Sequence, residues 1–184
     1  MLKNFDTNTQ SQRGDFMKKT LIAAFFAGAV LSGSAAEIDI NGSFTGNGFG
    51  GKGFNWYTNS YLKPKVTRHQ MNGGIAIEIK SINGRDGQVY SGPIPGKAGD
   101  VFTLSVMAKG SGEGRLELML YDKNKRYTGT LKSVVFKVSK EMVKYTKEFT
   151  VPAQSGKETA FVRVAFTTLK GGEIYYQNAK LDKK

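Results

Sequence analysis

The chain has 184 residues, with no cysteine and a single histidine, His69. Without cysteine it can form no disulfide, no thiolate nucleophile and no cysteine-ligated zinc or iron–sulfur site. One histidine rules out a multi-histidine metal cluster. Several classes of enzyme and metalloprotein are therefore excluded before any motif is considered.

Positive charge, by contrast, is abundant. The chain has 27 Lys and Arg against 15 Asp and Glu, a formal net charge of +12, and this favours anionic partners. Its 12 Phe and 8 Tyr supply enough apolar surface for a folded core.

Residues 17–36 have the features of a secretory signal peptide. Lys18 and Lys19 follow Met17, an eleven-residue apolar run covers residues 21–31, and small residues lead up to Ala36. The run is shorter than the ~20 residues that span a bilayer, so it favours a signal peptide over an anchor. We expect cleavage after Ala36 and a secreted, periplasmic or cell-surface protein with no membrane span.

Residues 1–16 are polar and aperiodic, so we expect a non-native or disordered extension before a true start at Met17. Residues 37–184 then form one domain of 148 residues. Residues 1–36 hold only four basic and two acidic residues, so the domain keeps 23 basic and 13 acidic residues and a charge of +10. The charge therefore belongs mostly to the folded domain, which we expect to be a monomer.

Most of the domain alternates between apolar and polar residues with a period of two, the pattern of strands with one buried face. The alternating segments are residues 38–44, 74–82, 101–108, 115–121, 143–151, 160–166 and 173–181. Glycine-rich and Asn/Asp-rich turns separate them, and no helical apolar pattern is sustained. The sequence predicts an all-β fold, a single antiparallel β-sandwich.

One face of the predicted sheets combines tyrosines with planar polar side chains. Such a face suits a sugar, whose C–H surfaces pack on aromatic rings and whose hydroxyls take hydrogen bonds. The alternative is that these outward residues are simply solvated. The candidates are Gln88, Tyr90, Arg115, Glu117, Tyr121 and Arg163, with Tyr57, Tyr61 and Tyr127 in loop-like stretches as rim contacts.

Trp56, the single tryptophan, is a further candidate for the carbohydrate-binding site. Its position is equally compatible with packing beneath the first loops, and both interpretations stay open.

Catalysis has little support in the sequence. The 13 carboxylates of the domain are scattered, with no evident acid pair or activated nucleophile, and His69 has no second histidine to pair with. We expect a protein that is not an enzyme.

Several motifs occur in a characteristic order. They read NGSF (41–44), FNW (54–56), GGIAIEI (73–79), QVY (88–90), KAGDVFTLSVMAKGSG (97–112), YTKEFTV (145–151) and IYYQNAKL (174–181). The order and spacing resemble carbohydrate-binding modules of the family 4 and 9 type, in the galactose-binding-domain-like jelly-roll group. The resemblance covers essentially all of residues 37–184 and implies a jelly-roll sandwich that binds sugar.

In many members of that family a structural calcium lies away from the sugar site. The family commonly has Asp where this chain has Gln177, which lacks the charge that a hard cation favours. Asn41, Asn178 and backbone carbonyls remain as candidate calcium ligands, and no other cofactor is expected.

The sequence therefore predicts a secreted, non-catalytic carbohydrate-binding protein, with a polysaccharide or oligosaccharide as partner. The charge of +10 favours an acidic polysaccharide over a neutral one. The alternative is an extracellular or envelope structural module that uses the same sandwich for protein interaction. Nucleic acid is not expected as a partner, because the chain is predicted to be exported and its basic residues are not gathered with stacking aromatics.

Overall fold

Every regular element of the computed structural model is a β-strand, within the residues that it describes: 35–46, 48, 55–133, 135–153 and 157–184. The predicted all-β class is confirmed. The predicted extension and all but the last two residues of the predicted signal peptide lie outside the described residues. Over the described residues, no helix has the length and apolar character of a membrane span.

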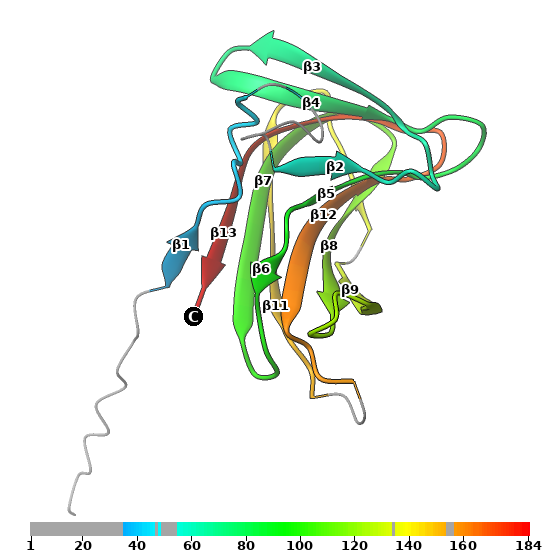
Figure 1. Ribbon diagram of the computed structural model, residues 1–184. Coiled ribbons are helices and arrows are strands. Elements are labelled where there is room, and N and C mark those ends of the chain that lie inside the picture. Colours follow the sequence, from blue (N-terminus) through cyan, green and yellow to red (C-terminus); the bar gives the residue numbers. More distant parts are fainter. Residues whose placement is uncertain (1–34, 47, 49–54, 134, 154–156) are drawn as a thin grey trace, which may run out of the picture. The chain divides into compact units, whose positions relative to one another are not determined.

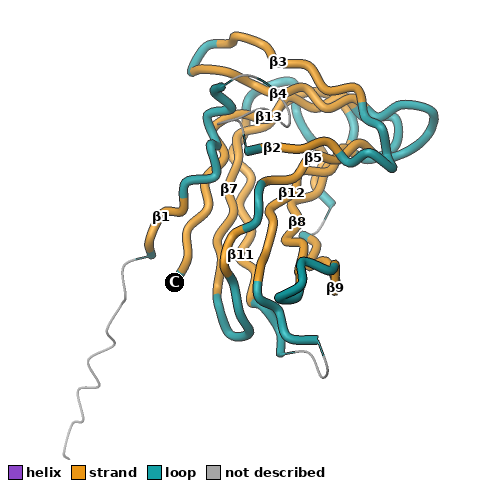
Figure 2. Tube along the Cα trace, in the orientation of Figure 1, coloured by secondary structure: helices purple, strands orange, loops and turns teal. Residues whose placement is uncertain are grey.

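The first sheet is antiparallel throughout (Figure 1), and its strands are orange in Figure 2. Its strand order is β11 (Val143–Thr150), β7 (Val101–Ser111), β13 (Glu173–Lys183), β4 (Gly74–Lys80) and β3 (Lys65–Met71), and β1 (Ala36–Ile38) also pairs with β13.

The second sheet is also antiparallel and carries the candidate site. Its order is β10 (Phe136–Lys137), β8 (Glu113–Tyr121), β12 (Phe161–Thr168), β5 (Gly87–Ser91) and β2 (Trp56–Thr58), with β6 (Ile94–Pro95) on β12 and β9 (Tyr127–Lys132) on β8. Neighbouring strands are seldom consecutive in sequence, so the two sheets form a jelly-roll sandwich.

The core lies between the sheets and is filled by the apolar halves of the alternating strands. Its fully or almost fully buried members include Phe102, Leu104 and Val106 of β7, Leu116, Leu118 and Leu120 of β8, Val162, Val164 and Phe166 of β12, and Ile77 and Ile79 of β4. Every second residue in these stretches is therefore buried, as the predicted alternation requires.

A stack of aromatic rings fills one part of this core. The ring of Trp56 lies parallel to Phe166 at 5.1 Å between centroids, and Phe166 stacks in turn on Tyr176 at 5.1 Å. Trp56 has no exposed surface, and its indole N–H donates to the carbonyl of Asn41 at 3.1 Å. This burial favours the packing interpretation of Trp56 over a ligand contact, and any part of Trp56 in binding sugar stays a prediction.

The alternating segment 38–44 also differs from its prediction. The strand ends at Ile38, and the chain then turns, with positive φ angles of 51° at Asn41 and 53° at Phe44. The backbone N–H of Phe44 donates to the carbonyl of Asn41, which closes the turn. Alternation persists here because Ile40 and Phe44 both enter the core from a turn.

Gly112 makes the tight passage from β7 in one sheet to β8 in the other. Its φ is +94°, and a Cβ there would lie 2.7 Å from the Cα of Gly172. Both the backbone conformation and the close approach require glycine. The passage sets the start of β8, the strand that supplies Arg115, Glu117, Met119 and Tyr121 to the site.

Candidate binding cleft

The candidate site lies on the face of the second sheet that points away from the core. Because the strands are in fixed register, the outward residues form rows across the sheet. Gln88 lies opposite Thr167, which lies opposite Arg115. Ala165 lies between Tyr90 and Glu117 in the next row. Residues far apart in sequence are thereby brought onto one surface.

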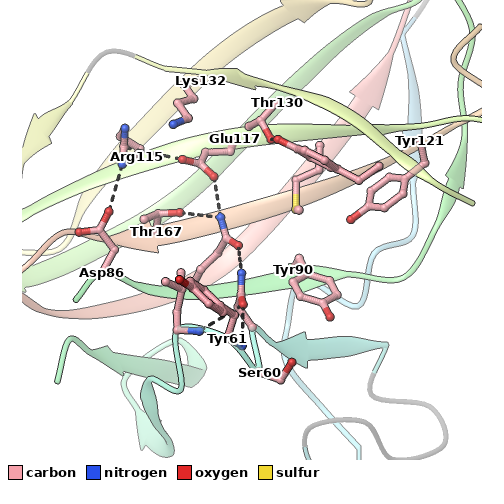
Figure 3. A pocket seen from close by; sticks show the side chains of 15 residues that line it. Ser60, Tyr61, Asp86, Tyr90, Arg115, Glu117, Tyr121, Thr130, Lys132 and Thr167 are labelled. Carbon is pink, nitrogen blue, oxygen red and sulfur yellow. Dashed lines mark hydrogen bonds and ion pairs between the residues drawn. The ribbon is translucent and has the colours of Figure 1, made fainter. Parts of the chain in front are cut away.

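This face holds a cleft of about 490 Å³ (Figure 3). Its lining residues are Asn59, Ser60, Tyr61, Leu62, Asp86, Gln88, Tyr90, Arg115, Glu117, Met119, Tyr121, Tyr127, Thr130, Lys132 and Thr167. Figure 3 shows the charged side chains of Asp86 and Arg115 toward one end and the rings of Tyr90 and Tyr121 toward the other.

Glu117 is the centre of the polar end. Its carboxylate accepts a hydrogen bond of 2.7 Å from the side-chain amide of Gln88, which also donates to the hydroxyl of Thr167 at 3.1 Å. The amide of Asn59 donates in turn to Gln88 at 2.8 Å. The polar side chains are thus fixed by one another, and their remaining donors and acceptors are preorganised for a ligand.

Arg115 joins the two carboxylates of the cleft. Its guanidinium lies 3.3 Å from Asp86 and 3.7 Å from Glu117. Burial raises the pKa of the Glu117 carboxyl above its ordinary value, against the opposing attraction of Arg115 and Lys132. The residue is only 3% exposed, which explains why desolvation outweighs its partners.

This raised pKa gives a testable pH dependence. Between the ordinary carboxyl pKa and the raised one, the folded protein binds more protons at Glu117 than the unfolded chain does. The contribution of Glu117 to the free energy of unfolding therefore falls as the pH rises through that interval. Urea unfolding at about pH 4.5 and pH 7 should show Glu117→Gln gaining stability relative to the wild type at the higher pH. An equal offset at both pH values would contradict the assignment.

Tyrosine rings make up the other end. Tyr57 stacks on Tyr90 at 5.9 Å and Tyr127 meets Tyr121 edge-on at 5.9 Å. The guanidinium of Arg163 lies against three rings, with its Cζ 5.8 Å from the centroid of Tyr57, 5.2 Å from Tyr90 and 5.3 Å from Tyr121. Cation–π contacts of this kind hold the rings and the guanidinium in place.

The structure thus brings six of the seven candidates together. Five line the cleft, Arg163 adjoins it through the tyrosines, and Trp56 alone lies in the core. Of the three tyrosines placed in loops by their sequence, Tyr61 and Tyr127 line the cleft, while Tyr57 lies beside it in β2 and Tyr127 begins β9. Their part in binding sugar stays a prediction.

Several lining residues were missed by sequence reasoning. Thr167 continues the outward series of β12, so the period of two could have identified it. Thr130 and Lys132 lie on β9, whose polar, glycine-containing sequence gives no strand signal. Asp86 looked like a turn residue, and only the fold places it against Arg115.

The residues predicted as calcium ligands can be located in the structure. Asn41 and Asn178 line a second cleft of about 600 Å³ with Glu37 and Asp39. The side-chain amide of Asn41 is already engaged in its own turn, donating to the carbonyl of Thr45 at 2.7 Å and accepting from its N–H at 3.2 Å. Gln177 is buried elsewhere, with its amide 3.4 Å from the carbonyl of Asn72.

Among the described residues no group of three or more His, Cys, Asp or Glu could hold a metal ion. We assign no calcium ion to this cleft.

No family model and no curated protein matches the chain. Solved structures do match its fold. A structure described as "CBM4 structure and function" has a TM-score of 0.55 and 17% identity over 79% of this chain and 100% of the other. The CBM22-1–GH10 part of the xylanase Xyn10B from Clostridium thermocellum, in complex with xylohexaose, has a TM-score of 0.55 and 14% identity over 71% of this chain and 26% of the xylanase chain.

The chain shares its β-sandwich fold with these structures. The same fold also serves catalysis, because an apo cyclase from Fischerella sp. matches with a TM-score of 0.59 and 14% identity, over 83% of this chain and 98% of the cyclase. Fold likeness at such identities does not decide between binding and catalysis, so function has to be argued from the cleft.

Proposed function

We propose that the protein is an exported, non-catalytic polysaccharide-binding module whose ligand lies in the cleft of the second sheet. The observation that carries this proposal is the pairing, on one sheet face, of tyrosine rings with a hydrogen-bonded row of planar polar side chains. The rings offer apolar faces to sugar C–H groups, and the polar row sets the orientation of the hydroxyls.

The arrangement of the carboxylates supports binding over hydrolysis. A glycosidase needs one carboxyl group to donate a proton and a second to act as base or nucleophile. Here the two carboxylates of the cleft, Asp86 and Glu117, both face the same guanidinium of Arg115. Neither is left as an unengaged acid or nucleophile.

An acidic polysaccharide is favoured over a neutral one by the formal charge of +10 on residues 37–184, which hold 23 basic and 13 acidic residues. Export is supported by the signal-like residues 17–36. It predicts a mature protein that begins at Glu37, which N-terminal sequencing of the secreted material would show.

Affinity electrophoresis tests the binding. Gels containing neutral polysaccharides (xylan, β-glucan, laminarin) or acidic ones (polygalacturonate, alginate, glucuronoxylan) should retard the protein in at least one case, and incubation with that polymer should release no new reducing ends. Released reducing ends would establish an enzyme. Migration of the protein without retardation in every gel would contradict the proposal and favour the protein-interaction module.

A further inference from the structure

The side chain of Arg163 has different neighbours from that of Arg115, the other arginine on this face of the sheet. It lies on β12, opposite Met119 of β8. Its guanidinium is held among three tyrosine rings at 5.2 to 5.8 Å. Among the residues that the structure describes, which include every Asp and Glu after residue 34, no carboxylate is within ion-pair distance of it. Arg115, by contrast, faces both Asp86 and Glu117.

An arginine in this setting is a ready receptor for an anion. The guanidinium stays charged at any physiological pH and presents its donors as a planar fork that matches the two oxygens of a carboxylate. The three rings lie against the guanidinium and restrict its motion. No described side chain donates or accepts a hydrogen bond with this guanidinium, so its donors are available to a ligand.

The surrounding charge also favours an anion at this end. The hairpin that joins Tyr121 to Tyr127 carries Lys123, Lys125 and Arg126, all exposed. Exposed positive charges on this hairpin raise the local concentration of an anionic chain and steer it toward the cleft.

We propose that Arg163 binds the carboxylate of a uronic acid residue while the neighbouring tyrosines contact the sugar ring. This inference rests on the proposed polysaccharide binding and adds to it a substrate class and the residue that selects it. It extends the site past the cleft, because Arg163 and Tyr57 adjoin the cleft without lining it.

Paired polymers test the inference. Polygalacturonate, alginate and glucuronoxylan are each compared with their carboxyl-reduced forms by affinity electrophoresis. The wild type should bind at least one acidic form about tenfold to a hundredfold more tightly than its reduced form, as expected for a charge-assisted bidentate pair. Arg163→Gln should lose that preference, because its affinity for the acidic form should fall much more than its affinity for the reduced form.

Lys144→Gln is the matched control, since it removes one positive charge from an exposed position on β11 of the other sheet. It should keep the full preference. A melting temperature near that of the wild type shows that Arg163→Gln folds. Arg163→Lys is the second variant. It retains the charge and loses the planar fork, and should show an intermediate preference.

The possible failures are distinct. Equal binding of acidic and reduced polymers by the wild type, or an equal loss of preference in Arg163→Gln and Lys144→Gln, overturns the role of Arg163 and leaves polysaccharide binding standing. Absence of binding to every polymer, acidic or reduced, overturns the proposed function itself and this inference with it.

Discussion

Replacing Tyr90 and Tyr121 together by alanine is expected to weaken polysaccharide binding more than about a hundredfold, since each aromatic anchor of an interface is worth about 2 kcal/mol and 1.4 kcal/mol is tenfold. The two rings lie on β5 and β8, on either side of β12, and both contact Arg163. Removing both takes away the central rings of that end of the cleft and leaves Tyr57 and Tyr127 without their aromatic partners.

The loss should be confined to binding. Both side chains are partly exposed on the outward face, and the core beneath them is unchanged. We expect the double variant to melt within a few degrees of the wild type. Tyr175→Ala, which removes a ring from the outward face of the first sheet, should leave the affinity unchanged. Affinity electrophoresis in the polymers that retard the wild type measures all three proteins.

The single variants show whether the two rings act together. Because they share Arg163, the effects of Tyr90→Ala and Tyr121→Ala need not add, and a double-mutant cycle gives the coupling. Retention of wild-type affinity by the double variant would contradict the placement of the ligand in this cleft.

The strands of the core could be predicted because successive side chains of a strand point to opposite faces, so a buried face appears in the sequence as every second residue being apolar. In β8 the apolar residues 116, 118 and 120 point inward, so the outward face of Arg115, Glu117 and Tyr121 was predicted correctly. What alternation could not predict is that the outward Glu117 is almost fully buried. That burial depends on Gln88 of β5 and on β9. Neither adjoins Glu117 in sequence.

The cluster around Arg163 shows a second limit. Its rings come from β2, β5 and β8, and the order of those strands in the sheet does not follow their order in the chain. The pattern within one strand shows which residues share a face of that strand. Which strands lie side by side, and so which of these residues come together, depends on the topology of the sheet. Trp56 is the converse case, because its own segment is compatible with a rim contact and only the stack with Phe166 and Tyr176 places it inside.

The core position of Trp56 leads to the largest stability effect that we expect. Truncating a fully buried aromatic residue to alanine costs about 3–5 kcal/mol, from lost burial and the cavity left behind. Trp56→Ala removes a ring that packs on Phe44 and Phe166, and it removes the hydrogen bond to Asn41, so the turn after β1 also loses one of its attachments to the core. A value near the upper end of that range is expected, measured as the change in the free energy of unfolding in urea.

One variant separates the contribution of the Trp56 ring from that of its N–H, and a second serves as an exposed control. Trp56→Phe keeps an aromatic ring and loses the hydrogen bond to Asn41, so it should cost less than the alanine variant and keep the wild-type affinity for polysaccharide. Tyr61→Ala removes a ring that is 77% exposed and should change stability by less than about 0.5 kcal/mol. If Trp56→Phe instead kept full stability and lost polysaccharide binding, the tryptophan would be a ligand contact, because a ring that only packs the core has no direct means of changing affinity alone.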